Sequence, residues 1–171
     1  MAPRFSDEYD ESSWLLKALR EAAHELESQL WDLDEEELRR RPADDGMSLK
    51  EIAAHLRDCE QHFVSTLERI FSQEAPRLRA FDADALVLER DYRGADLYDL
   101  LSEFGELRQR SVRLLWMEDG WERSGVHPYR GPVTVAQLVR EQSEHDLEHL
   151  WQARRLRGTI EAREPAGQPL G

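Results

Sequence analysis

The sequence contains a single cysteine, Cys59, so the chain cannot form an internal disulfide and nothing in it points to an oxidising compartment. It has no run of about 18 apolar residues, which excludes a transmembrane helix. The first residues, MAPRFSDEYDESS, are too acidic for a secretory signal peptide. Basic residues are also scarce, since 23 Lys and Arg stand against 36 Asp and Glu, for a net charge of -13. We therefore expect a cytoplasmic protein that binds neither nucleic acid nor a membrane.

The length and composition fit one domain with its own hydrophobic core. The chain has 171 residues, of which 40% are hydrophobic, and this is enough to bury a core without help from disulfides. No internal repeat or low-complexity segment divides the sequence. We expect residues 1–171 to form a single domain.

Apolar residues recur at steps of three and four in four segments of the chain. This spacing predicts amphipathic helices over about 8–31, 48–73, 95–117 and 135–157. Ser48 followed by Glu51 is a capping-box pattern, which marks the start of the second helix. Thr134 with Gln137 repeats the pattern at the start of the fourth, and Gly158 is expected to end that helix.

The connections between these helices predict the topology. The links over 32–47 and 118–134 are moderate in length, so each joins an antiparallel pair, and DEEELRR in the first favours a short helical turn. The link over 74–94 is too long for a simple antiparallel turn, so it runs back along the bundle and leaves the second and third helices parallel. With no credible strand, the sequence predicts an all-α four-helix bundle with an up-down-down-up course and a long crossover. The tail, 159–171, has little to bury and is expected to be loose.

The fourth predicted helix carries a polar stretch in the middle of its inward-facing seam. By spacing, Gln142, His145, His149 and Gln152 continue the apolar stripe. Polar groups at such positions are costly unless something satisfies them. His145 and His149 lie four residues apart, so both rings project from one face and can share a ligand. Two histidines that are only hydrogen-bonded inside a polar core layer would give the same pattern. If the histidines share a ligand, Gln142 and Gln152 would orient their rings or contact bound water.

His55, in the second predicted helix, offers a third imidazole at a matching depth. It lies about 10 Å below the end of the bundle where its helix begins, and His149 lies about 12 Å below the same end. Three imidazoles from two neighbouring helices suit Zn, Ni, Fe or Mn, which the spacing does not distinguish. Such a set leaves coordination positions open for water or substrate, as catalytic metal sites do.

Other histidines and the cysteine have simpler interpretations. A Glu-x-x-His motif occurs only at His24, so a di-iron centre is not expected, and His24 is interpreted as a surface residue. Cys59 and His62 follow His55 on the same helical face. Either residue could approach the predicted metal site from deeper in the bundle. We interpret Cys59 as a small buried residue, and His62 as a hydrogen-bonded residue of the core or next to the metal ligands.

Seven arginines are expected near the end of the bundle closest to the predicted metal site. On an acidic protein they would steer an anionic thiol or carboxylate substrate toward the metal. The alternative is ordinary surface charges paired with nearby Glu and Asp. The seven are Arg39, Arg40, Arg41, Arg93, Arg154, Arg155 and Arg157.

Two stretches of the sequence resemble the DinB-like (DNA-damage-inducible) superfamily. SLKEIAAHLRDCEQHF contains His55, and GPVTVAQLVREQSEHDLEHLWQARRL contains the HDLEHLWQ block of the fourth predicted helix. The likeness extends over the four predicted helices and weakens in the crossover and tail. It implies an up-down-down-up bundle in which His55, His145 and His149 hold a divalent transition metal, and it implies no DNA binding.

The resemblance also implies a metal-dependent enzyme that acts on a small molecule. Relatives include transferases and isomerases that use a low-molecular-weight thiol, such as bacillithiol, mycothiol or glutathione, and many relatives have no assigned reaction. We therefore expect a thiol-dependent S-transferase or a hydrolase, in which the metal activates a thiol or water. Family habit implies a homodimer. The competing hypothesis is a non-catalytic helical bundle that binds a metal or another ligand.

Overall fold

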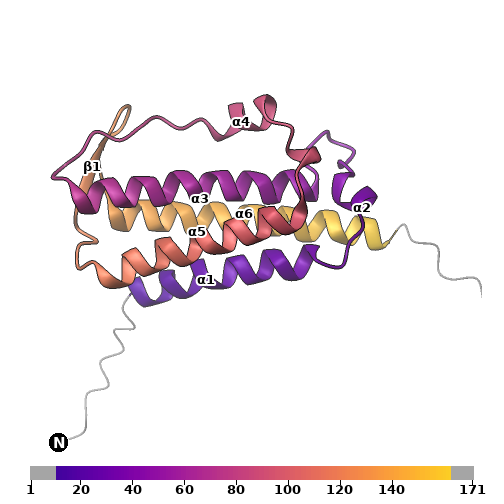
Figure 1. Ribbon diagram of the computed structural model, residues 1–171, viewed down its shortest axis with the longest axis horizontal. Coiled ribbons are helices and arrows are strands. Elements are labelled where there is room, and N and C mark those ends of the chain that lie inside the picture. Colours follow the sequence, from indigo (N-terminus) through magenta and orange to yellow (C-terminus); the bar gives the residue numbers. More distant parts are fainter. Residues whose placement is uncertain (1–10, 163–171) are drawn as a thin grey trace, which may run out of the picture.

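A computed structural model describes residues 11–162, and most of these residues are helical. Four long helices lie side by side as a bundle (Figure 1). The predicted helix start at residue 8 and the tail beyond residue 162 lie outside the described residues. The elements in chain order are α1 (Glu11–Leu30), α2 (Glu35–Arg39), α3 (Leu49–Ser72), α4 (Ala83–Glu89), the 3-10 turn η1 (Tyr92–Gly94), α5 (Leu97–Met117), β1 (Ser124–His127), β2 (Gly131–Thr134) and α6 (Val135–Glu161).

The four long helices follow the predicted up-down-down-up course. In Figure 1, α1 and α6 run in one direction, and α3 and α5 run in the other. The crossover returns along the outside of the bundle, so α3 and α5 are parallel neighbours. Helix α6 packs against both α1 and α3. The face between α3 and α6 is therefore where the predicted metal site must lie.

Side-chain caps begin α3 and α6 at the predicted residues. The side chain of Ser48 accepts a hydrogen bond from the backbone N–H of Glu51, and the Glu51 carboxylate accepts one from the N–H of Ser48 at 2.8 Å. Thr134 and Gln137 form the same reciprocal pair. Each box satisfies N–H groups that have no partner within the helix, so both helices start at a fixed residue.

The predicted end of the last helix is wrong, because α6 continues through Gly158 to Glu161. The side chain of Ile160 is buried in the core, with 3% of its surface exposed. Packing of that side chain therefore holds a last turn that a glycine alone would have ended.

The connections contain elements that the sequence did not predict. We expected only a loop over 118–134, but β1 and β2 form an antiparallel hairpin there. The crossover, expected without regular structure, contains α4 and η1, whereas α2 forms the short helical turn that was predicted. Each strand has four residues, which is too short for an alternating pattern to stand out among turn residues.

The hairpin fixes the start of the crossover. The backbone N–H of Leu78 donates to the carbonyl of Val126 at 2.9 Å, and the N–H of Val126 donates to the carbonyl of Pro76 at 2.8 Å. The Leu78 side chain packs directly on Gly125, where a Cβ would lie 2.6 Å from a Leu78 methyl carbon. Only glycine allows this approach.

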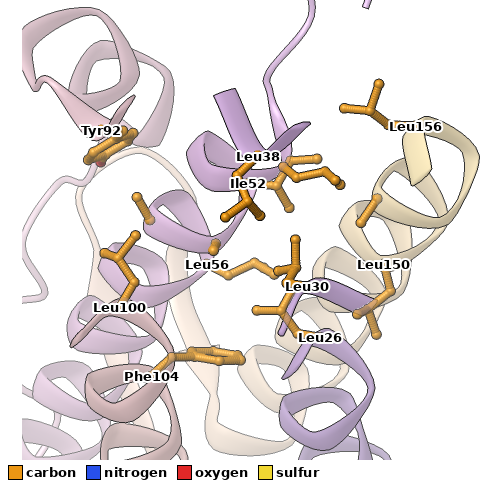
Figure 2. Packing of buried hydrophobic residues seen from close by; sticks show 14 of the residues in the cluster. Leu26, Leu30, Leu38, Ile52, Leu56, Tyr92, Leu100, Phe104, Leu150 and Leu156 are labelled. Carbon is orange, nitrogen blue, oxygen red and sulfur yellow. The ribbon is translucent and has the colours of Figure 1, made fainter. Parts of the chain in front are cut away.

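Apolar side chains form two clusters, one toward each end of the bundle. Figure 2 shows the first, to which α1, α2, α3, α5 and α6 all contribute; it includes Leu26, Leu30, Leu38, Ile52, Leu56, Leu100, Phe104, Leu150 and Leu156. The second cluster lies toward the hairpin and includes Leu19, Phe63, Leu67, Ile70, Leu115, Val135 and Val139. Between them along the helices lies a set of buried polar side chains that we call the polar layer: Glu60, Arg108, Ser111, Gln142 and Asp146.

The polar layer is organised around Arg108. Its guanidinium group donates to Glu60 at 2.8 Å, lies 2.7 Å from a carboxylate oxygen of Asp146, and donates to the carbonyl of Leu19 at 2.6 Å. Burial alone would lower the pKa of Arg108, but the two carboxylates raise it, so the side chain stays charged. Burial raises the pKa of Asp146 to about 6, against the opposing effect of Arg108. One side chain thus links all four long helices.

We expect Arg108→Met to lower the free energy of unfolding by about 3–5 kcal/mol, because Glu60 and Asp146 would stay buried without a counter-charge. Arg110→Met in the same helix is the matched control, since Arg110 pairs with Glu68 at the surface and its side chain is 61% exposed. Loss of that pair should change stability by less than about 1 kcal/mol. Urea unfolding at neutral pH measures both changes, and equal small losses would contradict the central role of Arg108.

Candidate metal centre

Three histidines from α3 and α6 meet at the face between these two helices. Nε2 of His145 lies 3.1 Å from Nε2 of His55 and 3.1 Å from Nε2 of His149. The ring centroids of His55 and His149 are 4.6 Å apart. His55 and His149 are buried, and His145 is half-buried. The structure thus brings together the three residues that spacing and depth selected from the sequence.

Burial keeps two rings of this group, those of His55 and His145, uncharged. Loss of solvent, together with the neighbouring imidazoles, lowers the pKa of His55 to about 4. The same two causes lower the pKa of His145 to about 4. Both rings are therefore neutral at neutral pH, which is the form of imidazole that binds metals.

Hydrogen bonding among the rings does not account for this arrangement. A neutral imidazole carries one N–H, yet Nε2 of His145 faces two other Nε2 atoms, and one proton can serve only one of these contacts. Nδ1 of His149 lies 3.0 Å from Oε1 of Gln152, which accepts the N–H there and leaves the Nε2 lone pair free to bind. Converging lone pairs on neutral rings fit a divalent transition metal ion.

Cys59 is buried, as we expected, and it also lies close to the histidines. Its Sγ lies 3.7 Å from Nε2 of His55 and 3.9 Å from Nε2 of His145. One ligand atom from each of His55, Cys59 and His145 lies within 4.8 Å of the others. Burial raises the pKa of the thiol to about 12, so without a metal it is protonated and weakly nucleophilic.

Gln142 and His62 have contacts away from the three rings. The amide of Gln142 donates to Glu60 at 3.3 Å, so this residue serves the polar layer and does not orient an imidazole as we expected. The ring of His62 stacks on Phe81 with centroids 4.3 Å apart, and its Nε2 lies 3.4 Å from the hydroxyl of Thr66. His62 thus has its own partners, and its half-buried ring agrees with the predicted structural role.

The arginines predicted near the site are largely engaged elsewhere. Five of the seven form ion pairs with Glu or Asp side chains, which is the alternative that the sequence left open. These five are Arg39, Arg40, Arg41, Arg154 and Arg157.

The sequence analysis missed one carboxylate of the crossover, Asp84, whose charge acts on the group of histidines and Cys59. Helix α4 packs on α3. Burial is the largest influence on the pKa of both Cys59 and His145, raising the first and lowering the second, and the charge of Asp84 in α4 adds a smaller upward effect on each. Asp84 is itself exposed to solvent. The only sequence signal was the pair of apolar residues that follows it, Leu86 and Val87, which pack against the cluster of Figure 2.

Comparison with known proteins gives relatives of the same architecture. A protein of Oceanobacillus iheyensis named "Putative metal-dependent hydrolase OB0413" is 22% identical over 143 residues, which cover 82% of each chain. YfiT from Bacillus subtilis, described as a probable metal-dependent hydrolase with an unusual four-helix bundle topology, superposes with a TM-score of 0.82 and 20% identity over 94% of each chain. The four-helix bundle protein TT2238 gives a TM-score of 0.62 and 16% identity, over 84% of this chain and 98% of its own.

The structural likenesses show the four-helix bundle fold. Within the part of the chain that the structure describes, no helix is long and apolar enough to cross a bilayer. The family model of the DinB superfamily matches residues 18–153, a range that includes all three histidines and Cys59. The chain therefore belongs to the DinB superfamily.

Proposed function

We propose that this protein is a metal-dependent hydrolase of a small molecule, with one divalent transition metal held by His55, His145 and His149. The observation that carries the proposal is the approach of three imidazoles, with both His55 and His149 placing Nε2 at 3.1 Å from Nε2 of His145. Two similar proteins with names that refer to metal-dependent hydrolysis support the reaction class. Hydrolysis needs only water as co-substrate, whereas an S-transferase would use the same metal to activate a low-molecular-weight thiol.

The three imidazole nitrogens favour some divalent metal ions over others. Imidazole nitrogen suits Zn²⁺, Ni²⁺ and Fe²⁺, whereas Mn²⁺ prefers carboxylate and carbonyl oxygen. When bound, such an ion supplies Lewis acidity and activates a water nucleophile at neutral pH. Three protein nitrogens leave coordination positions for that chemistry.

The remaining roles fall to residues around the histidines. Gln152 accepts the Nδ1 proton of His149 and so fixes the ring with Nε2 toward the site. Asp84, exposed on the crossover, is the carboxylate that we assign as proton acceptor for the attacking water, because its charge acts on both Cys59 and His145. The buried carboxylates Glu60 and Asp146 are bound to Arg108 and are not free for this role.

Metal content tests the ligand assignment. We expect untagged protein to contain about one transition metal ion per chain, and His145→Ala to lose it, because the ring of His145 contacts both other imidazoles. His24→Ala is the matched control, since His24 is exposed on α1 and should not affect metal content. Elemental analysis of the three proteins gives the result. A full complement of metal in His145→Ala would refute the assignment.

Removal of the Gln152 side chain should weaken metal binding without abolishing it. We expect Gln152→Ala to lower metal affinity about 10–100-fold, as is typical when the hydrogen-bond partner of a ligating imidazole is lost. Gln61→Ala, at an exposed position of α3, serves as the control and should bind normally. Competition with a chromogenic chelator measures the affinities. Equal affinities for wild type and Gln152→Ala would show that Gln152 does not hold the ring.

A substitution at Asp84 separates catalysis from metal binding. We expect Asp84→Asn to lower kcat/KM about 10²–10⁴-fold on a panel of activated esters and amides, because the proton acceptor is lost. Its metal content should stay unchanged. Glu89→Gln, also exposed on α4, is the control and should keep full activity. Absence of turnover by the wild-type metal-loaded protein would favour the non-catalytic binding function instead.

A further inference from the structure

We propose that Cys59 is a fourth protein ligand of the metal, so that the ion is held by three imidazoles and one thiolate. This inference rests on the proposed metal site of His55, His145 and His149. It concerns a residue of α3 that lies one helical turn after His55, on the same face of the helix.

The distances from His145 and Cys59 to their neighbouring donor atoms are close to those between ligands of one ion. The ligand atoms of His55, Cys59 and His145 all lie within 4.8 Å of one another, and Nε2 of His149 joins this set through its 3.1 Å contact with Nε2 of His145. With Zn–N bonds of about 2.0–2.1 Å and a Zn–S bond of about 2.3 Å, tetrahedral angles place neighbouring nitrogens about 3.3 Å apart and sulfur about 3.6 Å from each nitrogen. The observed N–N separations are both 3.1 Å. The observed S–N separations are 3.7 Å to His55 and 3.9 Å to His145. The sulfur therefore lies where a neighbouring ligand atom would lie.

The charge balance of the site also favours a thiolate. Three neutral imidazoles would leave both positive charges of a divalent ion uncompensated among buried groups. The buried carboxylates of the polar layer, Glu60 and Asp146, already bind Arg108. When Cys59 binds, its S–H bond breaks, a sulfur–metal bond forms and the proton passes to solvent, so the net charge of the site falls from +2 to +1.

A thiolate ligand has consequences for selectivity and access. Sulfur donors shift the preference of a site toward softer ions, so a His3Cys set favours Zn²⁺ over Mn²⁺. Four protein donors complete a tetrahedron. A substrate then reaches the ion through a fifth coordination position or by displacing Cys59.

Cobalt(II) substitution tests the inference by absorption spectroscopy. Cobalt bound to a thiolate gives a sulfur-to-metal charge-transfer band in the near ultraviolet, in addition to the visible bands of a low-coordinate cobalt site. Because Cys59 is the only cysteine of the chain, any such band must come from it. We expect metal-free wild-type protein to develop both sets of bands at one equivalent of Co²⁺. Cys59→Ser should lose the near-ultraviolet band and keep visible bands.

The spectrum of the wild type decides the question even if the variant fails to fold. Visible cobalt bands without a near-ultraviolet band would overturn ligation by Cys59 and leave the histidine site intact. No cobalt bands in either region would refute the proposed metal site itself. Cys59→Ala provides a second variant, and it should behave as Cys59→Ser does. Retention of the near-ultraviolet band by either variant would also overturn the inference.

Discussion

The buried ion pairs of Arg108 are the interaction on which the arrangement of the bundle depends. A guanidinium group that is 2% exposed contacts Glu60 of α3 and Asp146 of α6, and it also binds the backbone of α1. Glu60 directly follows Cys59 in sequence, and Asp146 directly follows His145. Any rotation or sliding of α3 or α6 that separated the three histidines of the candidate site would therefore break a buried ion pair, which is strongly unfavourable. The charged layer holds the register of the two helices that carry the site.

A charged layer in the middle of a bundle stabilises the fold less than apolar packing can, because burying charged groups removes them from water. Well-packed hydrophobic residues of similar volume are often at least as stabilising as a buried ion pair. The two apolar clusters at either end compensate, since between them they contain most of the buried apolar side chains of the described residues. Figure 2 shows the first of them. Stability is thus provided by the ends, and the central section is free to be polar. Imidazoles with converging lone pairs need that setting, because an apolar layer would leave their second nitrogens without partners.

The helices, and in part the meeting of the histidines, could be predicted from local regularities. The capping box fixes where α3 begins, and the rise of about 1.5 Å per residue gives the depth of His55. The matching depth of His149 was counted from the predicted end of the last helix, and α6 in fact continues to Glu161, so the meeting of the rings depends on packing as well as on that count. Arg108 could not be predicted in this way, since its partners are far away in sequence and no local pattern marks them. The same holds for Gln142, which shares a seam with the histidines but turns to Glu60. For Cys59 the helical period gave the correct face, but how closely the ring of His145 approaches the thiol depends on packing between helices.

The course of the chain explains why an exposed carboxylate of the crossover acts on the candidate site. In an up-down-up-down bundle, a short turn at one end would join α3 to the next helix, and no segment would pass the middle. Here the crossover must travel the length of α3 (Figure 1). Its start is fixed by pairing with Val126, and its end by hydrogen bonds from Arg90 and Tyr92 to Asp58 of α3. Helix α4 lies between these two anchors and packs on α3, so the path that makes α3 and α5 parallel also brings the charge of Asp84 close enough to act on Cys59 and His145. The sequence of a crossover with no long-range periodicity gives no sign of this effect.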